Sequence, residues 1–352
     1  MNVTSERAGV YTSYQVSNVS YSTLSRGVVG AAALASTGSP ATVYEISSAA
    51  DAKRIFGSCN LTRLIQAALN NGAATVAAIP IFSSTTPSES MYATAFARLA
   101  KREDVQVIIC DSRTSGVHAA MKTAITDTDN MEPFKIGVVE ISGSVSSTVS
   151  AASNLDCERM VMVAPNAAED ESLMMDIPIL SASLAGAIVS EADPARPLNG
   201  AELVGIDYLT KPFSEGEINS LVRGGVCPVE MSGGKVRVIR GVTTRTTDGD
   251  GASDPTWHEL TTVRIVDNVV PEVRNTLRAM FQRAKNTAQT RDAIRTQVVV
   301  VLEKKIAAEI IDSYGNVSVT PDASDPTICN VSFEFAVAHG LNKIVLTANI
   351  TV

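Results

Sequence analysis

The sequence predicts an α/β fold for most of the chain and a smaller α+β unit after it. Apolar segments of strand length alternate with segments of helical periodicity between residues 41 and 164. Each strand segment is apolar along its whole length, which is typical of strands covered on both faces of a partly parallel sheet. We therefore expect a central α/β domain, a C-terminal α+β domain, and extended N- and C-terminal arms.

Composition places the chain among ordinary globular proteins. It has 352 residues, of which 45% are hydrophobic and 19% charged, enough material for two or three domains. The longest apolar runs, such as residues 297–302, are far too short to cross a bilayer, and the first residues lack the order of a signal peptide. We expect a soluble protein that is made in the cytosol and does not insert into a membrane.

The central domain is predicted at residues 27–255 and follows an extended arm at 1–26. The arm is rich in Ser, Thr, Asn and Tyr and has no amphipathic helix. A tightly packed strand is expected around residues 26–34, and helices at 61–73 and 88–104, where apolar residues recur with helical spacing. The further predicted strands are 41–46, 74–81, 105–110, 135–141 and 159–164. Residues 224–260 indicate short strands joined by glycine turns.

The C-terminal domain is predicted at residues 256–341. An amphipathic helix is expected at 267–285 with Pro271 in its first turn, and a second at 290–316 with Gly315 as its terminator. Two strands follow, at 316–320 and 328–338.

The last segment, 342–352, is predicted as an extended strand arm. Its apolar residues alternate with polar ones, so that Ile344, Leu346, Ile350 and Val352 share one face. A strand of this kind carries unpaired backbone N–H and C=O groups along its edge, which proteins normally cover. The sequence therefore raises the question of what covers it.

Motifs of catalysis and of ligand binding are missing from the sequence. There is no nucleophile elbow, phosphate-binding loop, HExxH motif or dinucleotide fingerprint, so we expect no catalytic residues, no cofactor and no metal. The five cysteines are odd in number and dispersed without a CxxC pair, which favours reduced and mostly buried thiols over disulfides or a zinc site.

Two weaker patterns leave alternatives open. Cys110 and His118 lie close in sequence and could form a thiol nucleophile with an imidazole base, although Cys110 ends an apolar strand and is better interpreted as a core thiol. The acidic clusters at residues 127–130 and 248–251 resemble parts of calcium loops. Neither continues to the distal Glu, so plain turns are favoured.

One short region is basic in a chain whose net charge is −8. Between residues 272 and 295 six cations face only Glu272 and Asp292, a local excess of 6 − 2 = +4. The cations are Arg274, Arg278, Arg283, Lys285, Arg291 and Arg295. The segment is either a solvated helix face or a surface for an acidic protein. Nucleic acid is disfavoured, because the pI is near 5.1 and no aromatic residues are interleaved.

Several longer segments carry a resemblance to a known family. They are "AGVYTSY" near the start, "SRGVVGAAALASTGSPATVYEISSAADAKRIFGS", "NLTRLIQAALNNGAATVAAIPI", and the run from "DNVVPEVRNTLRAMF" through "FEFAVAHGLNKIVLTANITV". In these segments the chain resembles the sheath proteins of contractile phage tails and of related tail-like bacteriocins. The resemblance covers most of the chain and is weakest from residue 165 to 260.

The resemblance implies that arms of one subunit add strands to the C-terminal domain of its neighbours. The implied subunit-interface residues are Val10, Tyr14, Val16, Tyr21, Val331, Phe333, Phe335, Ile344, Leu346, Ile350 and Val352. It further implies that a helix of the C-terminal domain grips an inner tube, and the six cations named above are the tube-facing candidates. Another molecule would then cover the strand edge of the last segment.

The function implied in this way is structural and not enzymatic. A sheath protein polymerises helically around an inner tail tube, works with baseplate and tail terminator proteins, and contracts to drive the tube through a target cell envelope. We would then expect assembly in the bacterial cytoplasm and a place in a virion tail or a released tail-like particle. Two alternatives remain, a cytosolic α/β enzyme with an unrecognised site and a non-contractile self-assembling shell protein.

Overall fold

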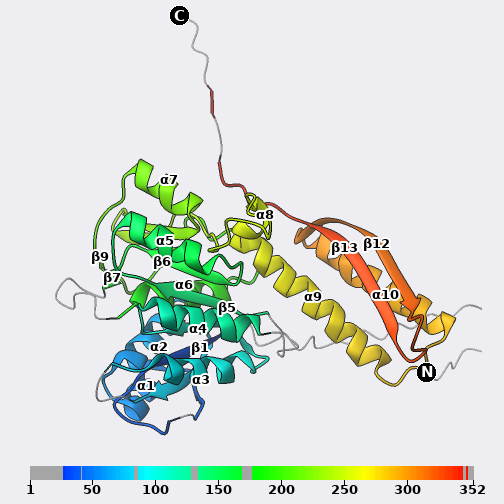
Figure 1. The fold of residues 1–352 in the computed structure, drawn as a ribbon, viewed down its shortest axis with the longest axis horizontal. Coiled ribbons are helices and arrows are strands. Elements are labelled where there is room, and N and C mark those ends of the chain that lie inside the picture. The colour runs from blue at the N-terminus through cyan, green and yellow to red at the C-terminus, as the bar shows by residue number, and fades with distance from the viewer. Residues whose placement is uncertain are drawn as a thin grey trace, which may run out of the picture.

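The computed structural model describes residues 27–40, 42–82, 86–127, 134–168, 177–343 and 346–347. Its largest element is a sheet of nine strands in the order β2-β3-β1-β4-β5-β6-β10-β11-β8 (Figure 1). The bounds are β1 Val28–Leu34, β2 Tyr44–Ile46, β3 Thr75–Ile81, β4 Val105–Cys110, β5 Ile136–Glu140, β6 Met160–Ala164, β8 Glu202–Leu203, β10 Val226–Ser232 and β11 Lys235–Val238. The five strands predicted between residues 41 and 164 are confirmed as β2 to β6.

The centre of this sheet is parallel. Strands β3, β1, β4, β5, β6 and β10 run in one direction, whereas β2, β11 and β8 pair antiparallel at the two edges. Parallel neighbours require a crossover between them, and the helices of this part of the chain provide it. A small antiparallel pair, β7 Ala167–Ala168 with β9 Tyr208–Leu209, lies beside the large sheet.

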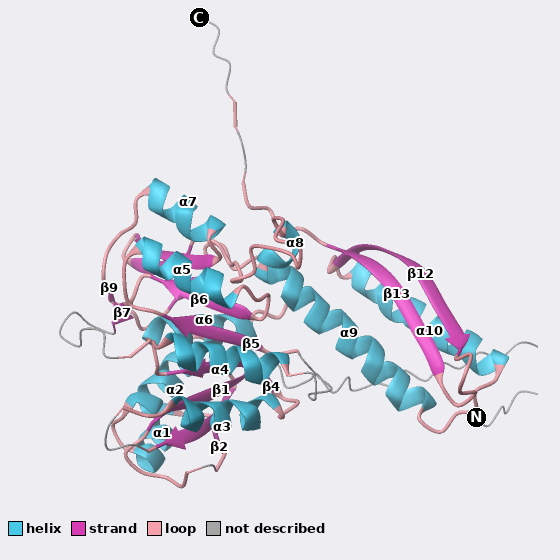
Figure 2. Cartoon of the chain, viewed as in Figure 1, coloured by secondary structure: helices cyan, strands magenta, loops and turns pink. Residues whose placement is uncertain are grey.

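Helices cover both faces of the sheet (Figure 2). Side chains of β1 alternate between the two faces: Val29, Ala31 and Ala33 join one apolar core with α1, α2 and α6, whereas Val28 and Ala32 join the other with α3, α4, α5 and α7. The helix bounds are α1 Ala49–Phe56, α2 Asn60–Asn70, α3 Glu89–Ala100, α4 Ser115–Thr126, α5 Val145–Leu155, α6 Ile179–Ser190 and α7 Glu215–Arg223. The predicted helices at 61–73 and 88–104 are thus confirmed as α2 and α3, and the α/β fold class is confirmed.

Helix α6 was not predicted from the sequence. Nearly all of its residues are buried, because it lies between the sheet and α2. A helix that is apolar all round shows no amphipathic period. Its close approach to α2 depends on Gly186, where an added Cβ would come within 2.4 Å of the Ala68 carbonyl oxygen.

The C-terminal unit packs two long helices against a strand hairpin. Helices α9 Leu260–Phe281 and α10 Ala288–Ala307 lie beside β12 Ile311–Pro321 and β13 Cys329–Val337, and a short helix, α8 Pro255–His258, precedes them. A third apolar core joins α9, α10, β12 and β13. In Figure 1, α9 runs from the large unit to the far tip of the molecule. Leu260 and Val263 belong to the first core and Ile265 onward to the third, so α9 is shared by both units.

Two details of the predicted C-terminal helices are wrong. Pro271 lies inside α9 and not in its first turn, because burial of Leu260 and Val263 in the central core extends the helix toward the N-terminus. Gly315 does not terminate α10; it lies within β12. Helix α10 instead ends at Ala307, and Glu309, with φ 56°, takes the left-handed turn at which Ile310 N–H donates to the Lys305 carbonyl. The two predicted strands of this unit are confirmed as β12 and β13.

Charged side chains fix α9 to the central unit. Arg159 donates from Nη1 to both carboxylate oxygens of Asp267, at 2.5 and 2.6 Å. The guanidinium groups of Arg159 and Arg274 both lie over the Phe134 ring, at 5.8 and 5.4 Å from its centroid. Arg264 donates to backbone carbonyls of the segment 191–196. Among the described residues no helix is both long and apolar enough to cross a membrane.

Candidate functional site

The hairpin β12–β13 is the part of the molecule best suited to pair with another chain. Its two strands pair antiparallel from Ile311 opposite Val337 to Pro321 opposite Cys329, and within the described residues no third strand joins them. Both outer edges therefore carry backbone groups without a strand partner in the described part of the chain. An isolated pair of strands is marginal in water, and three or more strands with an apolar face are more stable.

Only one face of the hairpin is apolar. Val331, Phe333 and Phe335 are half-buried and pack against the third core, and the two phenylalanine rings stack at 6.1 Å. The alternate residues Asn330, Ser332 and Glu334 are exposed. The three predicted interface residues on β13 thus point toward their own unit. An added strand would pair with the backbone edge, and its apolar side chains would extend this apolar face.

The β12 side of the hairpin is irregular. The pairing register shifts between Gly315 and Ser318, and Asn316 has φ 46°, as expected of a bulge that strengthens the local twist. Beside the bulge lies an open groove of about 540 Å³ between α10 and β12. It is lined by Arg291, Asp292, Arg295, Asn316, Val317, Ser318 and Val319. Two of the predicted tube-facing cations therefore line a groove beside the strand edge.

The predicted tube-facing residues do not form one cluster. Arg278, Arg283, Lys285 and Arg295 are exposed around the end of α9 and the start of α10, the tip farthest from the central unit (Figure 1). Arg291 donates to Asn286 Oδ1 at 2.9 Å. Arg274 is half-buried and lies over Phe134, so the structure places it at the junction with the central unit.

Most predicted interface residues of the arms lie outside the described residues. These are Val10, Tyr14, Val16, Tyr21, Ile344, Ile350 and Val352. Leu346 is described, and 89% of its surface is exposed. The sequence missed the contacts of Asn342, whose side chain meets Asn199 of the central unit and Glu259, the residue before α9. The only signal in the sequence for these contacts was that a polar residue, Asn342, follows the alternating apolar positions of β13.

The pair Cys110 and His118 does not have the geometry of a nucleophile and its base. Cys110 is 2% exposed, and burial raises the pKa of its thiol to about 12. Its sulfur donates to the Ser112 carbonyl, and Nε2 of His118 lies 3.0 Å from the same oxygen. Burial also lowers the pKa of His118. Both side chains are used within the core, as the core interpretation of Cys110 predicts.

The place where an α/β sheet usually binds a ligand is filled by the protein itself. At the carboxyl ends of β1 and β4 the Asp111 carboxylate accepts hydrogen bonds from Leu34 N–H, from Asn60 Nδ2 and from the Tyr92 hydroxyl, at 3.0, 2.8 and 2.5 Å. Burial and this carboxylate raise the pKa of Tyr92. The network holds the two strand ends together, and both oxygens of the Asp111 carboxylate accept hydrogen bonds from the protein itself.

The acidic cluster at 248–251 forms a turn. Oδ1 of Asp248 accepts from the backbone N–H groups of Asp250 and Ala252, at 2.9 and 2.8 Å. In the described part of the chain, no three His, Cys, Asp or Glu side chains are grouped so that they could hold a metal ion. The cluster at 127–130 lies largely outside the described residues.

Comparison with known proteins shows what the chain is similar to. Residues 252–351 match the family model of the phage tail sheath C-terminal domain. The chain is also 26% identical over 259 residues to a tail sheath protein of Bacillus phage SP01, a match that covers 70% of this chain and 43% of that relative. The chain thus spans less than half the length of this curated relative.

Solved sheath proteins share the fold. A sheath tail protein from Desulfitobacterium hafniense has a TM-score of 0.69 at 14% identity, covering 94% of this chain and 100% of the other. The helical sheath of the anti-feeding prophage in its contracted state has a TM-score of 0.72 at 12% identity, covering 99% of each chain. A sheath tail protein from Listeria innocua has a TM-score of 0.68 at 13% identity, covering 88% of this chain and 94% of the other. The resemblance to tail sheath proteins is therefore confirmed.

Proposed function

We propose that this chain is a structural subunit of a contractile tail sheath. It polymerises helically around an inner tube through exchange of arms between neighbouring subunits, and contracts to drive the tube through a target cell envelope. The observation that carries the proposal is the two-stranded hairpin β12–β13, whose outer edges have no strand partner among the described residues. The hairpin lies within residues 252–351, which match the family model of the phage tail sheath C-terminal domain, and this match supports the proposal.

Strand addition explains both the open hairpin and the last segment of the sequence. Residues 343–352 alternate apolar and polar positions, and a neighbour's hairpin offers them an edge to pair with. Ordering ten residues costs roughly 10–20 kcal/mol, whereas about ten hydrogen bonds return about 1 kcal/mol each. Burial of four apolar side chains adds about 1.5–3 kcal/mol apiece, so one arm roughly breaks even. Two arms per subunit, repeated through a lattice, make the assembly stable.

The same reasoning assigns the other parts. The extended arms at 1–26 and 342–352 connect subunits, the central α/β domain at 27–255 moves as a rigid body, and the C-terminal domain at 256–341 receives the arms. The exposed cations at the tip of α9 and α10 face an acidic surface of the inner tube. Baseplate and tail terminator proteins lie at the two ends of the sheath. No nucleic acid takes part in the assembly, and the subunit catalyses no reaction. Assembly takes place in the bacterial cytoplasm, and the finished particle is a virion tail or a released tail-like particle.

Deletion of residues 343–352 tests arm exchange. We expect the truncated protein to unfold at the same urea concentration as the full chain but to form no tubes visible by negative-stain electron microscopy. As a matched control, the full chain with Thr347→Ala keeps the apolar face of the segment and should assemble normally. Normal tubes from the truncated protein would contradict the proposal.

Image analysis of those tubes separates a sheath from a non-contractile shell. A sheath should form two helical lattices of different pitch, one around the inner tube and one after contraction. A single lattice under all conditions would favour the shell protein. A compact monomer at every concentration would favour the α/β enzyme.

A further inference from the structure

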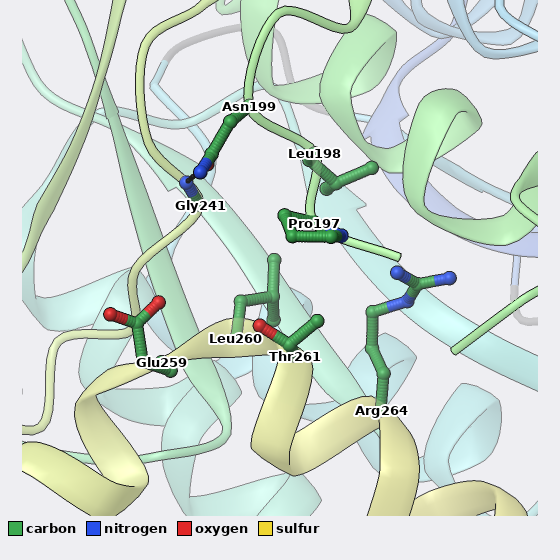
Figure 3. A pocket seen from close by; sticks show the side chains of 8 residues that line it. All are labelled: Pro197, Leu198, Asn199, Gly241, Glu259, Leu260, Thr261 and Arg264. Carbon is green, nitrogen blue, oxygen red and sulfur yellow. Dashed lines mark hydrogen bonds between the residues drawn. The ribbon is translucent and has the colours of Figure 1, made fainter. Parts of the chain in front are cut away.

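The C-terminal unit begins and ends at one place on the central unit. Helix α9 starts at Leu260 in a narrow crevice, and the chain that follows β13 returns to the same crevice. Figure 3 shows its wall, where the Asn199 side chain is directed to Gly241 and Glu259 lies at the start of α9. It is lined by Pro197, Leu198, Asn199, Gly241, Glu259, Leu260, Thr261 and Arg264.

Asn342 joins two parts of the crevice wall. Its Oδ1 accepts a hydrogen bond from Asn199 Nδ2 at 2.7 Å, and its Nδ2 donates to Glu259 Oε1 at 3.3 Å. Asn199 Oδ1 in turn accepts from Gly241 N–H at 3.3 Å, and the Glu259 carboxylate is paired with Arg240. Asn342 therefore bonds to side chains that the central unit itself holds in place.

Gly340 brings the backbone close to this wall. A Cβ at this position would lie 2.3 Å from Pro197 Cγ, and the proline ring has little freedom to move away. Only glycine lets the chain pass here without displacing the segment at Pro197. Two residues, one by its lack of a side chain and one by its amide, thus hold the returning chain to the central unit.

The described leucines beside these contacts are exposed. Leu341 is 72% exposed and Leu346 is 89% exposed, so the described protein covers little of either apolar side chain. The segment that would pair with a neighbour therefore begins where the contacts of Asn342 end.

We infer that Gly340 and Asn342, with Pro197, Asn199 and Glu259, form an arm anchor. The arm anchor fixes where the C-terminal arm leaves the subunit, and it passes tension on the arm to the central unit. The inference rests on the proposed arm exchange and goes beyond it, because it names the part of the subunit that holds the arm.

The hairpin geometry explains why such an anchor is useful. Val337, the last residue of β13, pairs with Ile311, the first residue of β12, at the open end of the hairpin. Tension applied there would separate the strand pairs one at a time, which needs little force. When Asn342 keeps its hydrogen bonds to Asn199 and Glu259, the same tension acts on these two residues. The strand pairs of the hairpin then carry no force.

Cleavage by trypsin at Lys343 tests the anchor in the unassembled protein. A protease binds the residues before the cleaved bond in an extended conformation. The contacts of Asn342 prevent the chain before Lys343 from entering the protease in this way. We expect Asn342→Ala, which removes both hydrogen bonds, to raise the rate of release of peptide 344–352, measured by mass spectrometry, about fivefold or more. An unchanged rate would overturn the inference.

Matched variants separate the anchor from general loosening. Gly340→Ala should act like Asn342→Ala because its new methyl group meets Pro197, whereas Gly216→Ala, where a Cβ has nothing within 4 Å, should leave the rate unchanged. Asn199→Ala and Asn342→Ala should be non-additive when combined, because they remove the same bond. Full additivity of the two changes would contradict direct coupling.

The mechanical part needs assembled tubes. Tubes of Asn342→Ala are expected to break into shorter pieces than wild-type tubes under the same shear, measured by electron microscopy. Equal lengths would overturn the role in carrying tension. If deletion of residues 343–352 left tubes normal, arm exchange would fail, whereas the trypsin rates would still report on the anchor.

Discussion

The central unit and the C-terminal unit bury their apolar side chains in different ways. The nine-stranded sheet has helices on both faces, and Phe96 is fully buried between α3 and the sheet. In the C-terminal unit the hairpin has helices on one face only, and Phe333 and Phe335 remain half-buried. The central unit thus completes its core within one chain, whereas the hairpin keeps part of its apolar face exposed and has no further strand on either edge among the described residues.

The largest effect on the monomer is expected in the central unit. Phe96→Ala removes a fully buried ring and should lower the free energy of unfolding by about 3–5 kcal/mol. Urea unfolding followed by circular dichroism measures it. Met91→Ala on the same helix, where the side chain is 37% exposed, is the control and should cost far less. A loss below about 1 kcal/mol for Phe96→Ala would show that this core is not closed.

The hairpin should respond more weakly in the monomer and more strongly in the polymer. Phe333→Ala is expected to cost about 1–2 kcal/mol in the urea unfolding of the monomer, because its ring is only half-buried. In tubes the same change should raise the protein concentration needed for assembly, since a neighbour's strand would bury the ring further. Ser332→Ala on the opposite face is the control. An equal cost for Phe333→Ala and Phe96→Ala would remove the distinction between the two units.

The exposed cations should matter for docking and not for stability. Reversal of Arg283 and Lys285 to Glu is expected to change the free energy of unfolding by less than about 0.5 kcal/mol, because both side chains are exposed. Binding to the inner tube should weaken at low salt, and the difference should shrink as salt screens the charges.

A control for this reversal is available on the central unit. Lys53 and Arg223 are also exposed, and changing both to Glu alters the net charge by the same amount. That control should leave tube binding unchanged. Equal weakening by both pairs would show that net charge decides, and not the tip of α9 and α10.

The smallest effect concerns a helix cap of the central unit. Glu217 accepts from Ser214 N–H and from Lys211, and these contacts, the backbone bond first, lower its pKa to about 2. Since the pKa is lower in the folded state, the contribution of Glu217 to stability is present above its usual pKa near 4.5 and is lost as the pH falls toward 2.

A carboxyl titration by NMR should therefore give a Glu217 midpoint near 2. Glu217→Gln should lower stability at pH 7, and the difference from the native protein should shrink in acid. A normal midpoint would show that the capping box of α7 is not closed.

Continuous apolar runs predicted the buried strands, and helical periodicity predicted the amphipathic helices. Strands β3 and β4 are buried on both faces and read as continuous apolar runs, and α2 shows a clear helical period, so all three could be predicted. Helix α6 could not, because burial on every side erases the period. Pro271 and Gly315 were misplaced because local signals for helix ends gave way to burial of residues farther along the chain.

The α/β class, the C-terminal helices and hairpin, and the resemblance to tail sheath proteins could all be predicted from the amino-acid order, because they depend on local periodicity and on long stretches of sequence. The three-dimensional packing was needed to show that Arg274 lies at the junction over Phe134, and that Asn342 meets Asn199 across 143 positions of the chain. Contacts between residues so far apart leave no periodic pattern. They exist only once the two units have packed together.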